Sequence, residues 1–382
     1  MKKELIKNVK QKFKELFSSP KVVVFSPGRI NLIGEHTDYN DGYTFPAAIN
    51  KGIALAMAKT KNKKSTAFAI DKDESYSFYL KDVAPLNKGG WRNYILGVIG
   101  ELQKKGIELG NFNLVFSGNI PGGAGMSSSA ALENSVVFAL NELFQLGLSK
   151  NEMILISQKA EHNYAGVHCG IMDQYASMFG EKKSALLMDC RSISSKAIQI
   201  NFKNYKLVLI NTNVKHNLSE SAYNNRRAVC ERVSKLLKVK ALRDATIQDL
   251  NKIKDELKDE DYQKALYVIQ ENIRVRAFMK AVENQDLKTV GELLYQSHEG
   301  LSLLYQVSCA ELNFLVDFAK KSSAVIGARM MGGGFGGCTL NLVHKKELKS
   351  FKKKVSHAFK NEFQKDCSIY KVKLSKGTHV VD

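Results

Sequence analysis

A short stretch near the start of the chain, PGRINLIGEHTDYNDG (27–42), concentrates side chains that are able to do chemistry. It places Arg29, Glu35, His36 and Asp38 within ten residues of one another. Carboxylates accept several hydrogen bonds and a histidine ring either donates or accepts, so this set is suited to holding the hydroxyl groups of a sugar. A polar turn capped by its own Asp and Asn side chains is the other interpretation. The residues alone leave both open.

A second stretch, PGGAGMSSSAALE (121–133), runs from glycines into three serines and then into good helix formers. Backbone amides of a glycine-rich loop and the start of a helix together form an anion site, even without a charged side chain. The usual phosphate loop carries a lysine that is missing here, so the helix dipole and a bound Mg²⁺ would have to supply the positive charge. A serine-capped helix after a flexible turn would look the same.

Three further features are candidates for the same site. The segment GGGFGGC (332–338) has five glycines in six residues, which predicts close approach of the backbone either to a ligand or to another part of the chain. Glu161 is expected on a helix, where it either completes a magnesium site or is merely solvated. Asp173 lies among apolar residues, and a buried carboxylate needs a partner, whether structural or catalytic.

These residues need elements that bring them together. Apolar patterns predict a helix at the N-terminus with Leu5, Val9, Phe13 and Phe17 on its buried face, and strands at 21–25 and 112–120. Helices are expected at 91–105, 127–146 and 151–167, and a strand at 205–213 that opens a second, helix-rich half. Strands mixed with helices without regular alternation indicate an α+β fold.

Composition excludes several classes of protein. The 382 residues carry a net charge of +19, but 47 of the 57 basic residues are lysines scattered along the chain without interleaved aromatics. This favours a lysine-rich surface over a nucleic-acid groove. The six cysteines form no C-x-x-C pair, which argues against a zinc site or a disulfide framework. The N-terminus lacks the apolar centre of a signal peptide, and no membrane span is expected. We therefore expect a cytoplasmic protein that binds neither nucleic acid nor membrane, and a monomer.

Taken together, the motifs resemble those of a known family. GRINLIGEHTDYNDGYTFP closely resembles the galactokinase signature, and PGGAGMSSSAALE and GGGFGGC resemble the second and third motifs of the wider GHMP kinase family. Segments such as AEHNYAGVHCGIMDQYAS and NTNVKHNLSESAYNNRR also look like galactokinase segments in the expected order. The resemblance covers nearly the whole chain. Met331 departs from the third motif, where a small hydroxyl residue is expected.

The resemblance implies a two-lobed α+β fold, with residues 1–204 and 205–382 as the lobes and the active site between them. It implies ATP- and Mg²⁺-dependent transfer of the γ-phosphoryl group to the anomeric hydroxyl of α-D-galactose, the first step of galactose use by the Leloir pathway. By this resemblance Arg29 stabilises the transition state and Asp173 acts as base or orients the hydroxyl. The residues that would hold the sugar are Glu35, His36, Thr37, Asp38 and Tyr223. Those that would hold the phosphates are Gly123, Ala124, Gly125, Met126, Ser127, Ser128 and Ser129, with Ser129 and Glu161 as ligands of Mg²⁺.

Two other functions remain open at this point. The same chemistry on N-acetylgalactosamine or arabinose is weakly disfavoured, because EHTDY and the compact chain look like the galactose branch. A non-catalytic sensor of galactose and ATP would not need Arg29, Asp173 and the serine run, all of which this chain keeps.

Overall fold

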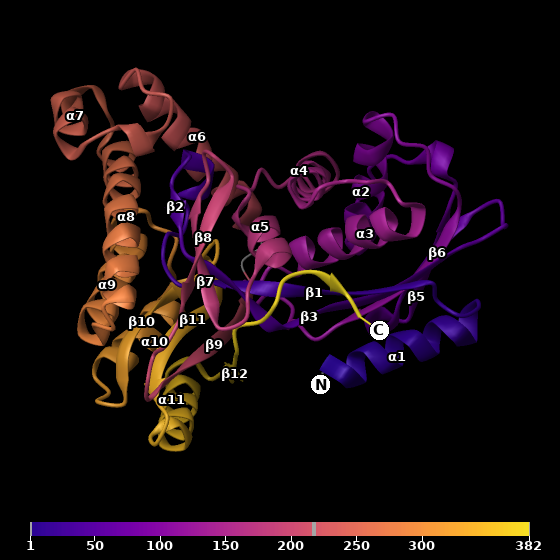
Figure 1. Ribbon diagram of the computed structural model, residues 1–382. Coiled ribbons are helices and arrows are strands. Elements are labelled where there is room, and N and C mark those ends of the chain that lie inside the picture. Colours follow the sequence, from indigo (N-terminus) through magenta and orange to yellow (C-terminus); the bar gives the residue numbers. More distant parts are fainter. Residues whose placement is uncertain (1, 216–218, 382) are drawn as a thin grey trace.

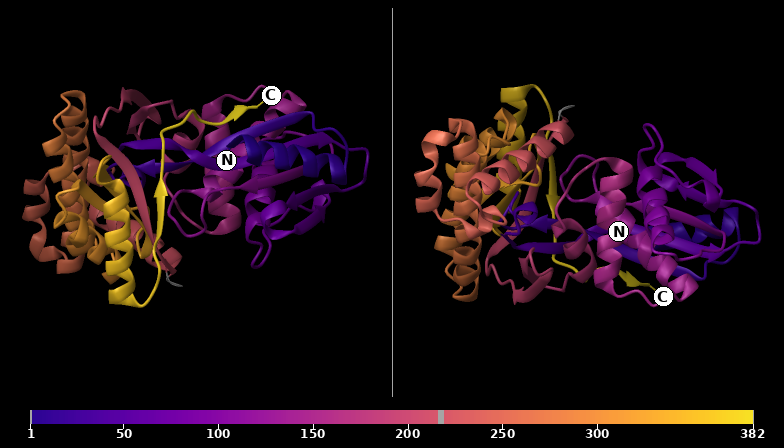
Figure 2. Two further views of the ribbon diagram at one scale, coloured as in Figure 1. Left: turned by 90° about the horizontal axis from the view of Figure 1, so that it is seen from below. Right: turned by 90° about the horizontal axis from the view of Figure 1, so that it is seen from above.

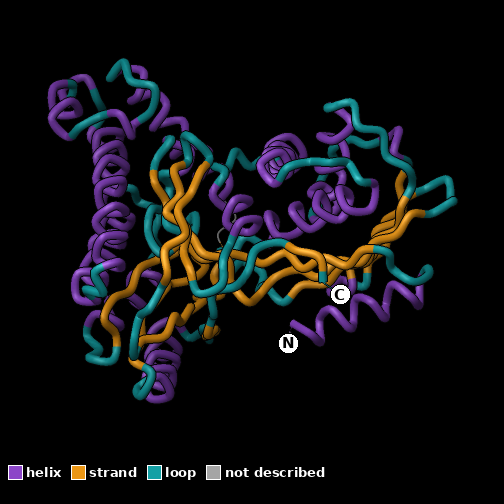
Figure 3. Tube along the Cα trace, in the orientation of Figure 1, coloured by secondary structure: helices purple, strands orange, loops and turns teal. Residues whose placement is uncertain are grey.

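Two sheets form the centres of two lobes in the computed structural model, which describes residues 2–215 and 219–381 (Figure 1). The first lobe has a six-stranded sheet in the order β13-β1-β3-β6-β4-β5, and the second has a four-stranded sheet in the order β10-β11-β9-β12. A third sheet has three strands in the order β2-β7-β8. Helices cover both sheets, and the strands run through the middle of the molecule (Figure 3). The α+β class is confirmed.

The first lobe holds the elements from the N-terminus to the third sheet. Its helices are α1 (Lys2–Leu16), α2 (Trp91–Lys104), α3 (Ser128–Phe144), α4 (Lys150–Ala160), a π-helical turn η4 (Glu161–Ala165) and α5 (Met172–Phe179). Its strands are β1 (Val22–Asn31), β2 (Tyr43–Thr44), β3 (Pro46–Lys59), β4 (Ser65–Ala69), β5 (Glu74–Phe78), β6 (Phe112–Gly118), β7 (Ser184–Asp189) and β8 (Ser194–Gln199).

The second lobe is richer in helix. Its strands are β9 (Tyr205–Lys215), β10 (Val325–Met331), β11 (Gly336–His344) and β12 (Ser368–Lys371). Its helices are α6 (Ser219–Leu236), α7 (Ile247–Lys252), α8 (Asp259–Glu283), α9 (Leu287–Glu299), α10 (Ala310–Lys320) and α11 (Leu348–Phe363).

The N-terminal helix confirms three of the four residues predicted on its buried face, while the fourth, Phe17, follows the end of the helix and is half-buried against the same cluster. Leu5, Val9 and Phe13 of α1 are buried against β1, β3 and β6. The remaining positions of the helix are mostly lysine and other polar residues. α1 covers one face of the first sheet, while α2, α3 and α4 lie on the other face (Figure 1).

The first strand differs from the prediction that it ends at residue 25. β1 continues through Ser26, Pro27 and Gly28 to Asn31, paired with β3. The register shifts between Pro27 and Arg29, because a bulge accommodates the proline without breaking the strand. The chain therefore delivers Arg29 from a strand rather than from a loop.

The C-terminal segment returns to the first lobe. β13 (His379–Val380) pairs with β1, and the backbone amide of Ser375 donates to the carbonyl of Ala48 at 2.8 Å. Figure 2 shows this segment crossing from the second lobe to lie beside the N-terminus. The first lobe therefore contains both the N-terminal part of the chain and its C-terminal end. The predicted boundary at residue 204 stays a prediction. Within the described residues, no helix has the length and apolar character needed to cross a membrane.

Candidate active site

A polar cavity of about 130 Å³ lies where segments of both lobes meet. We call it the polar cavity. Most of its lining residues are charged, polar or glycine: Arg29, Glu35, His36, Asp38, Glu161, Val167, Cys169, Met172, Asp173, Tyr223, Gly332 and Gly333. The folded chain thus brings together seven of the candidate residues from four separate segments, and two glycines of the third motif join them.

Arg29 and Asp173 form a two-pronged ion pair at this cavity. Arg29 at the end of β1 donates from Nε to Oδ1 of Asp173 at 2.7 Å and from Nη2 to Oδ2 at 2.8 Å. Its third nitrogen, Nη1, donates to the carbonyl of Gly125 at 2.6 Å. Burial alone would lower the pKa of Arg29, but the nearby charges of Asp173 and Glu35 outweigh it and the pKa is raised. The guanidinium therefore stays charged and links the polar cavity to the glycine loop.

The two acids of the first motif have different surroundings. Both hydrogen bonds to the side chain of Glu35 reach one oxygen, Oε1, which accepts from Arg329 at 2.9 Å and from the Gly332 amide at 2.8 Å. Oε2 has no partner among the described residues and remains for a ligand. Burial, and then the charge of Asp173, raise the pKa of Asp38 to about 7. Hydroxyl donors from a bound sugar would favour its charged form.

His36 has no nitrogen left for a ligand. Nε2 lies 3.2 Å from the carbonyl of Gly333 and Nδ1 lies 2.8 Å from the hydroxyl of Tyr39. Burial lowers the pKa of His36 to about 3, so the ring is neutral and donates from Nε2, while Nδ1 accepts from Tyr39. His36 thus joins the first motif to the third. His36 nevertheless lines the polar cavity, and its contact with a sugar, as the resemblance implies, stays a prediction.

Thr37 and Tyr223 also have distinct places. The hydroxyl of Thr37 is buried and donates to the carbonyls of Gly34 and Tyr43, at 2.9 and 2.7 Å. It holds the turn together and lies outside the lining of the polar cavity. Tyr223 comes from α6 in the second lobe and lines the cavity, with its ring centroid 5.2 Å from that of His36.

The glycine loop presents free backbone amides at the start of α3. Gly123, Gly125 and Ser127 all have positive φ, at 69°, 65° and 55°, so the loop turns sharply before the helix. The amides of residues 123–127 donate to no described residue, which leaves them for an anion. Ala124 and Met126 are buried in the core beneath the loop and contribute through their backbone. Ser127 donates its hydroxyl to Oδ2 of Asp173, so the loop and the ion pair are one structure.

The third glycine motif packs against the second. A Cβ built on Gly332 would lie 3.4 Å from Cα of Gly125, and one on Gly337 would lie 3.5 Å from the carbonyl of Gly123. Both glycines have positive φ, at 85° and 79°. Of the two explanations that the sequence left open, the close approach is to another part of the chain. Met331 is buried in the core and its side chain is turned away from the polar cavity.

Ser129 and Glu161 are neighbours, as the sequence predicted for a shared role. A hydrogen bond from Ser129 favours the charged form of Glu161, but burial and then the charge of Asp173 raise the pKa of Glu161 to about 7. Gln174 donates to Glu161 at 2.7 Å and to the buried Glu133 at 3.3 Å. Oε1 of Glu133 and Oε1 of Gln174 are buried without a partner among the described residues.

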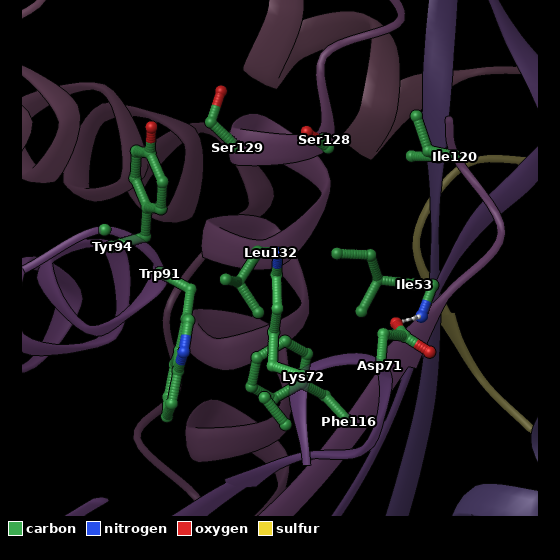
Figure 4. Close-up of a pocket in the computed structure, with 13 residues that line it drawn as sticks. Ile53, Asp71, Lys72, Trp91, Tyr94, Phe116, Ile120, Ser128, Ser129 and Leu132 are labelled. Atoms are coloured by element: carbon green, nitrogen blue, oxygen red, sulfur yellow. Dashed lines mark hydrogen bonds between the residues drawn. The ribbon is translucent and has the colours of Figure 1, made fainter. Parts of the chain in front are cut away.

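A second, larger cavity of about 270 Å³ begins at the other side of the serines. We call it the apolar cavity. It is lined by Ile53, Ala69, Asp71, Lys72, Gly90, Trp91, Tyr94, Phe116, Gly118, Ile120, Ser128, Ser129 and Leu132. Figure 4 shows Trp91 facing Ile53 across the cavity, with Ser128 and Ser129 at one end. Apart from the two serines, none of these residues is predicted from the sequence as a ligand contact, because they come from segments that show only core or turn patterns. The one signal was that Trp91, the single tryptophan of the chain, begins a helix.

Comparisons with known proteins agree with this geometry. The galactose-binding signature of galactokinases matches residues 11–59, and the N-terminal and C-terminal domain families of GHMP kinases match residues 93–181 and 278–361. The galactokinase of Thermotoga neapolitana is 38% identical over 359 residues, which cover 94% of this chain and 99% of that protein. The galactokinase of Clostridium tetani is 40% identical over 363 residues, 94% of this chain and 93% of that protein.

The chain belongs to the galactokinase family.

Solved structures place the galactokinase fold within a larger group. A crystal structure of Lactococcus lactis galactokinase complexed with galactose superposes with a TM-score of 0.93 at 35% identity, and covers 97% of this chain and 98% of that one. Mevalonate kinase from Methanococcus jannaschii shares the fold, with a TM-score of 0.64 at 18% identity over 93% of this chain and 98% of that one. The two-lobed GHMP kinase fold is thereby confirmed.

Family membership also confirms the class of activity. A galactokinase is a phosphotransferase that uses ATP, so this chain is a kinase with ATP as its phosphoryl donor. The roles of single residues remain proposals.

Proposed function

We propose that this protein transfers the γ-phosphoryl group of ATP to the anomeric hydroxyl of α-D-galactose, giving α-D-galactose 1-phosphate and ADP. The observation that carries this proposal is the Arg29–Asp173 ion pair, which lines the polar cavity and is bonded to the glycine loop at Gly125 and Ser127. It thus stands where an acceptor and a phosphate would meet. A related protein from Lactococcus lactis was crystallised with galactose, which supports the choice of sugar.

The polar cavity suits a small molecule with several hydroxyl groups. Oε2 of Glu35 has no donor among the described residues, and the carboxylate of Asp38 accepts from the backbone amide of Tyr39 and has further acceptor capacity. Tyr223 lines the cavity from the second lobe. A site built to bond hydroxyls rejects analogues that lack them, because its own buried polar groups are then left unpaired. We assign sugar binding to these three residues, and to His36 and Thr37 the maintenance of the turn that carries the acids.

Asp173 and Arg29 perform the chemical step in this proposal. The anomeric oxygen forms a bond to the γ-phosphorus as the bond from that phosphorus to the β-phosphate oxygen breaks, and ADP leaves. Phosphoryl transfer passes through a loose transition state, so positioning and charge stabilisation contribute more than early activation of the nucleophile. Asp173 orients the hydroxyl and accepts its proton late, while Arg29 stabilises the negative charge on the transferred group.

ATP would lie along the glycine loop, with its base in the apolar cavity. The free amides of residues 123–127 and the dipole at the start of α3 bind the phosphates. Trp91, Leu132 and Ile53 supply apolar surface of the kind that a purine ring fits. This assignment explains how the loop functions without the usual lysine.

The residues next to the loop fit a magnesium ion. Ser129 and Glu161 offer hard oxygen ligands, and two unpartnered buried oxygens on Glu133 and Gln174 lie beside them. The described residues hold no group of three or more His, Cys, Asp or Glu side chains suited to a metal, which agrees with an ion held largely by phosphates and water. When bound, Mg²⁺ would neutralise phosphate charge. Glu161 and Ser129 would hold it beside the loop.

A single assay tests the function. Purified protein is incubated with ATP and a panel of free sugars, and ADP release is measured. We expect turnover with galactose and little with N-acetylgalactosamine, arabinose or 2-deoxygalactose, and loss of turnover in EDTA that MgCl₂ restores. If no sugar in the panel causes ADP release, the protein is a sensor and not a kinase. If another sugar is turned over faster than galactose, that sugar is the substrate. A monomeric state and a cytoplasmic location stay predictions.

A further inference from the structure

Helix α8 of the second lobe holds the segment that carries Glu35 and Asp38. Three of its side chains end on backbone groups of that segment: Tyr267 donates to the carbonyl of Glu35 at 3.0 Å, Glu271 accepts from the amide of Gly34 at 3.0 Å, and Asn272 accepts from the amide of Tyr43 at 2.8 Å. These contacts join positions more than 220 residues apart in the chain. In Figure 1, α8 and β2 lie side by side.

The held segment has an unusual backbone. Gly34, His36 and Asp41 have positive φ, at 94°, 61° and 56°, and two of these are not glycine. Such conformations persist only where the surroundings determine them. The amide and carbonyl groups at the start of the turn, and the amide that follows it, all find their partners on α8. Helix α8 therefore fixes both ends of a turn whose backbone conformation the residues of the turn do not favour.

The three side chains of α8 are themselves fixed. Tyr267 and Glu271 have no exposed surface and Asn272 is buried. Glu271 also accepts from Ser297 at 2.6 Å and from Arg274 at 2.6 Å, so its charge is compensated and its direction is set. The ring of Tyr267 packs on that of Tyr305, with centroids 4.8 Å apart. A helix that served only to cover the core would present apolar side chains here.

We propose that α8 is the positioning element of the acceptor site, and that Tyr267, Glu271 and Asn272 are positioning residues. They set where Glu35 and Asp38 stand relative to the Arg29–Asp173 pair, and thereby determine how tightly the sugar binds. Recognition of hydroxyl groups needs acceptors held to about 0.5 Å. Because the acids belong to the first lobe and α8 to the second, sugar affinity depends on the contact between the lobes. The inference rests on the proposed function.

Tyr267→Phe is the most selective test, because it removes one hydroxyl and keeps the packed ring. One hydrogen bond contributes about 1 kcal/mol, which corresponds to about a fivefold change in an equilibrium constant. We expect the KM for galactose to rise about fivefold, with the KM for ATP and the melting temperature close to wild type. Asn272→Ala should act in the same direction.

Ile273→Ala is the matched control on the same helix. Its side chain is 51% exposed, so neither KM should change. An unchanged galactose KM in active Tyr267→Phe, or equal rises in both KM values, would overturn the positioning role. A lower melting temperature with an unaltered galactose KM would also overturn it and assign α8 to stability alone. Wild-type protein without galactose turnover would instead refute the proposed function, and the positioning role with it.

Discussion

At the scale of single residues, the proposed mechanism depends most on Asp173. Its two oxygens accept from Nε and Nη2 of Arg29 and from the hydroxyl of Ser127, so the carboxylate is held by groups from β1 and from the glycine loop. A carboxylate in this position orients a hydroxyl more rigidly than one on a free side chain would. Its negative charge is matched by the guanidinium beside it.

Asp173→Asn should lower the rate while galactose still binds. The amide keeps the shape but cannot accept both guanidinium bonds or take a proton, and removal of such a group costs about 10²–10⁴-fold in rate. Arg29→Lys should also be nearly inactive, because the single ammonium group of lysine does not replace a planar guanidinium that donates two parallel hydrogen bonds. Single-turnover phosphoryl transfer with each folded variant measures both effects.

A near-wild-type rate for Asp173→Asn would remove Asp173 from the mechanism. Catalysis would then rest on Arg29 and the bound cation. Calorimetric titration with galactose provides the control. If a variant no longer binds galactose, its low rate reflects the lost binding and not the chemical step.

At the scale of elements, the proposed ATP site is formed by the two glycine motifs and the start of α2. The second motif turns its amides outward because the third motif supports it from the other side through glycine-to-glycine contact. Trp91, at the first position of α2, donates from its ring to Glu74 at 2.9 Å and packs against Phe116 with centroids 5.3 Å apart. These contacts fix its ring at the wall of the apolar cavity.

Trp91→Ala should weaken the binding of ATP and leave the binding of galactose unchanged. Loss of about 50 Å² of apolar contact corresponds to about 1.3 kcal/mol, or about a tenfold rise in KM for ATP. The KM for galactose should stay near wild type, because no described residue of the polar cavity contributes to that wall. Trp91→Phe keeps an aromatic ring, so its KM for ATP should lie between those of wild type and Trp91→Ala. Equal KM values for ATP in wild type and Trp91→Ala would place the base elsewhere.

At the scale of the whole molecule, ion pairs join distant parts of the chain. Arg243, between α6 and α7, donates to Asp189 at the end of β7 at 2.5 and 2.8 Å, and also to the hydroxyl of Tyr43 at 2.6 Å. Burial would raise the pKa of Asp189, but the hydrogen bonds from Arg243 outweigh it and the pKa is lowered. The net charge of +19 makes such pairing of scarce carboxylates with arginines important for keeping the lobes together.

This pair should stabilise the fold above about pH 4 and lose its effect in acid. A carboxylate whose pKa is lower in the folded state stabilises that state above its unfolded pKa of about 3.9, and the gain disappears as pH falls through the folded pKa. Wild type should therefore melt at a higher temperature than Asp189→Asn at pH 6 to 7, and the difference should shrink toward pH 3. A difference that stayed constant over this range would show that Asp189 acts by packing and not by charge.

Much of this protein was readable before its structure. The amphipathic pattern of Leu5, Val9 and Phe13, the helix after the serines and the strand before the glycine loop depend on near neighbours, so the order of residues predicts them. The motifs are contiguous as well, which is why they indicated the family, the α+β fold, the glycine loop and the roles proposed for Arg29 and Asp173.

Other features depend on contacts between distant residues, which no local pattern records. Packing brings Asp173 to Arg29 across 144 positions and lets β1 continue past Pro27 through a bulge. It also turns His36 toward Gly333, assembles the wall of the apolar cavity and sets α8 against the turn of Glu35 and Asp38. Each of these is decided by side chains that meet only when the sheets and helices have packed, because their partners are chosen by shape, burial and unpaired polar groups rather than by spacing along the chain.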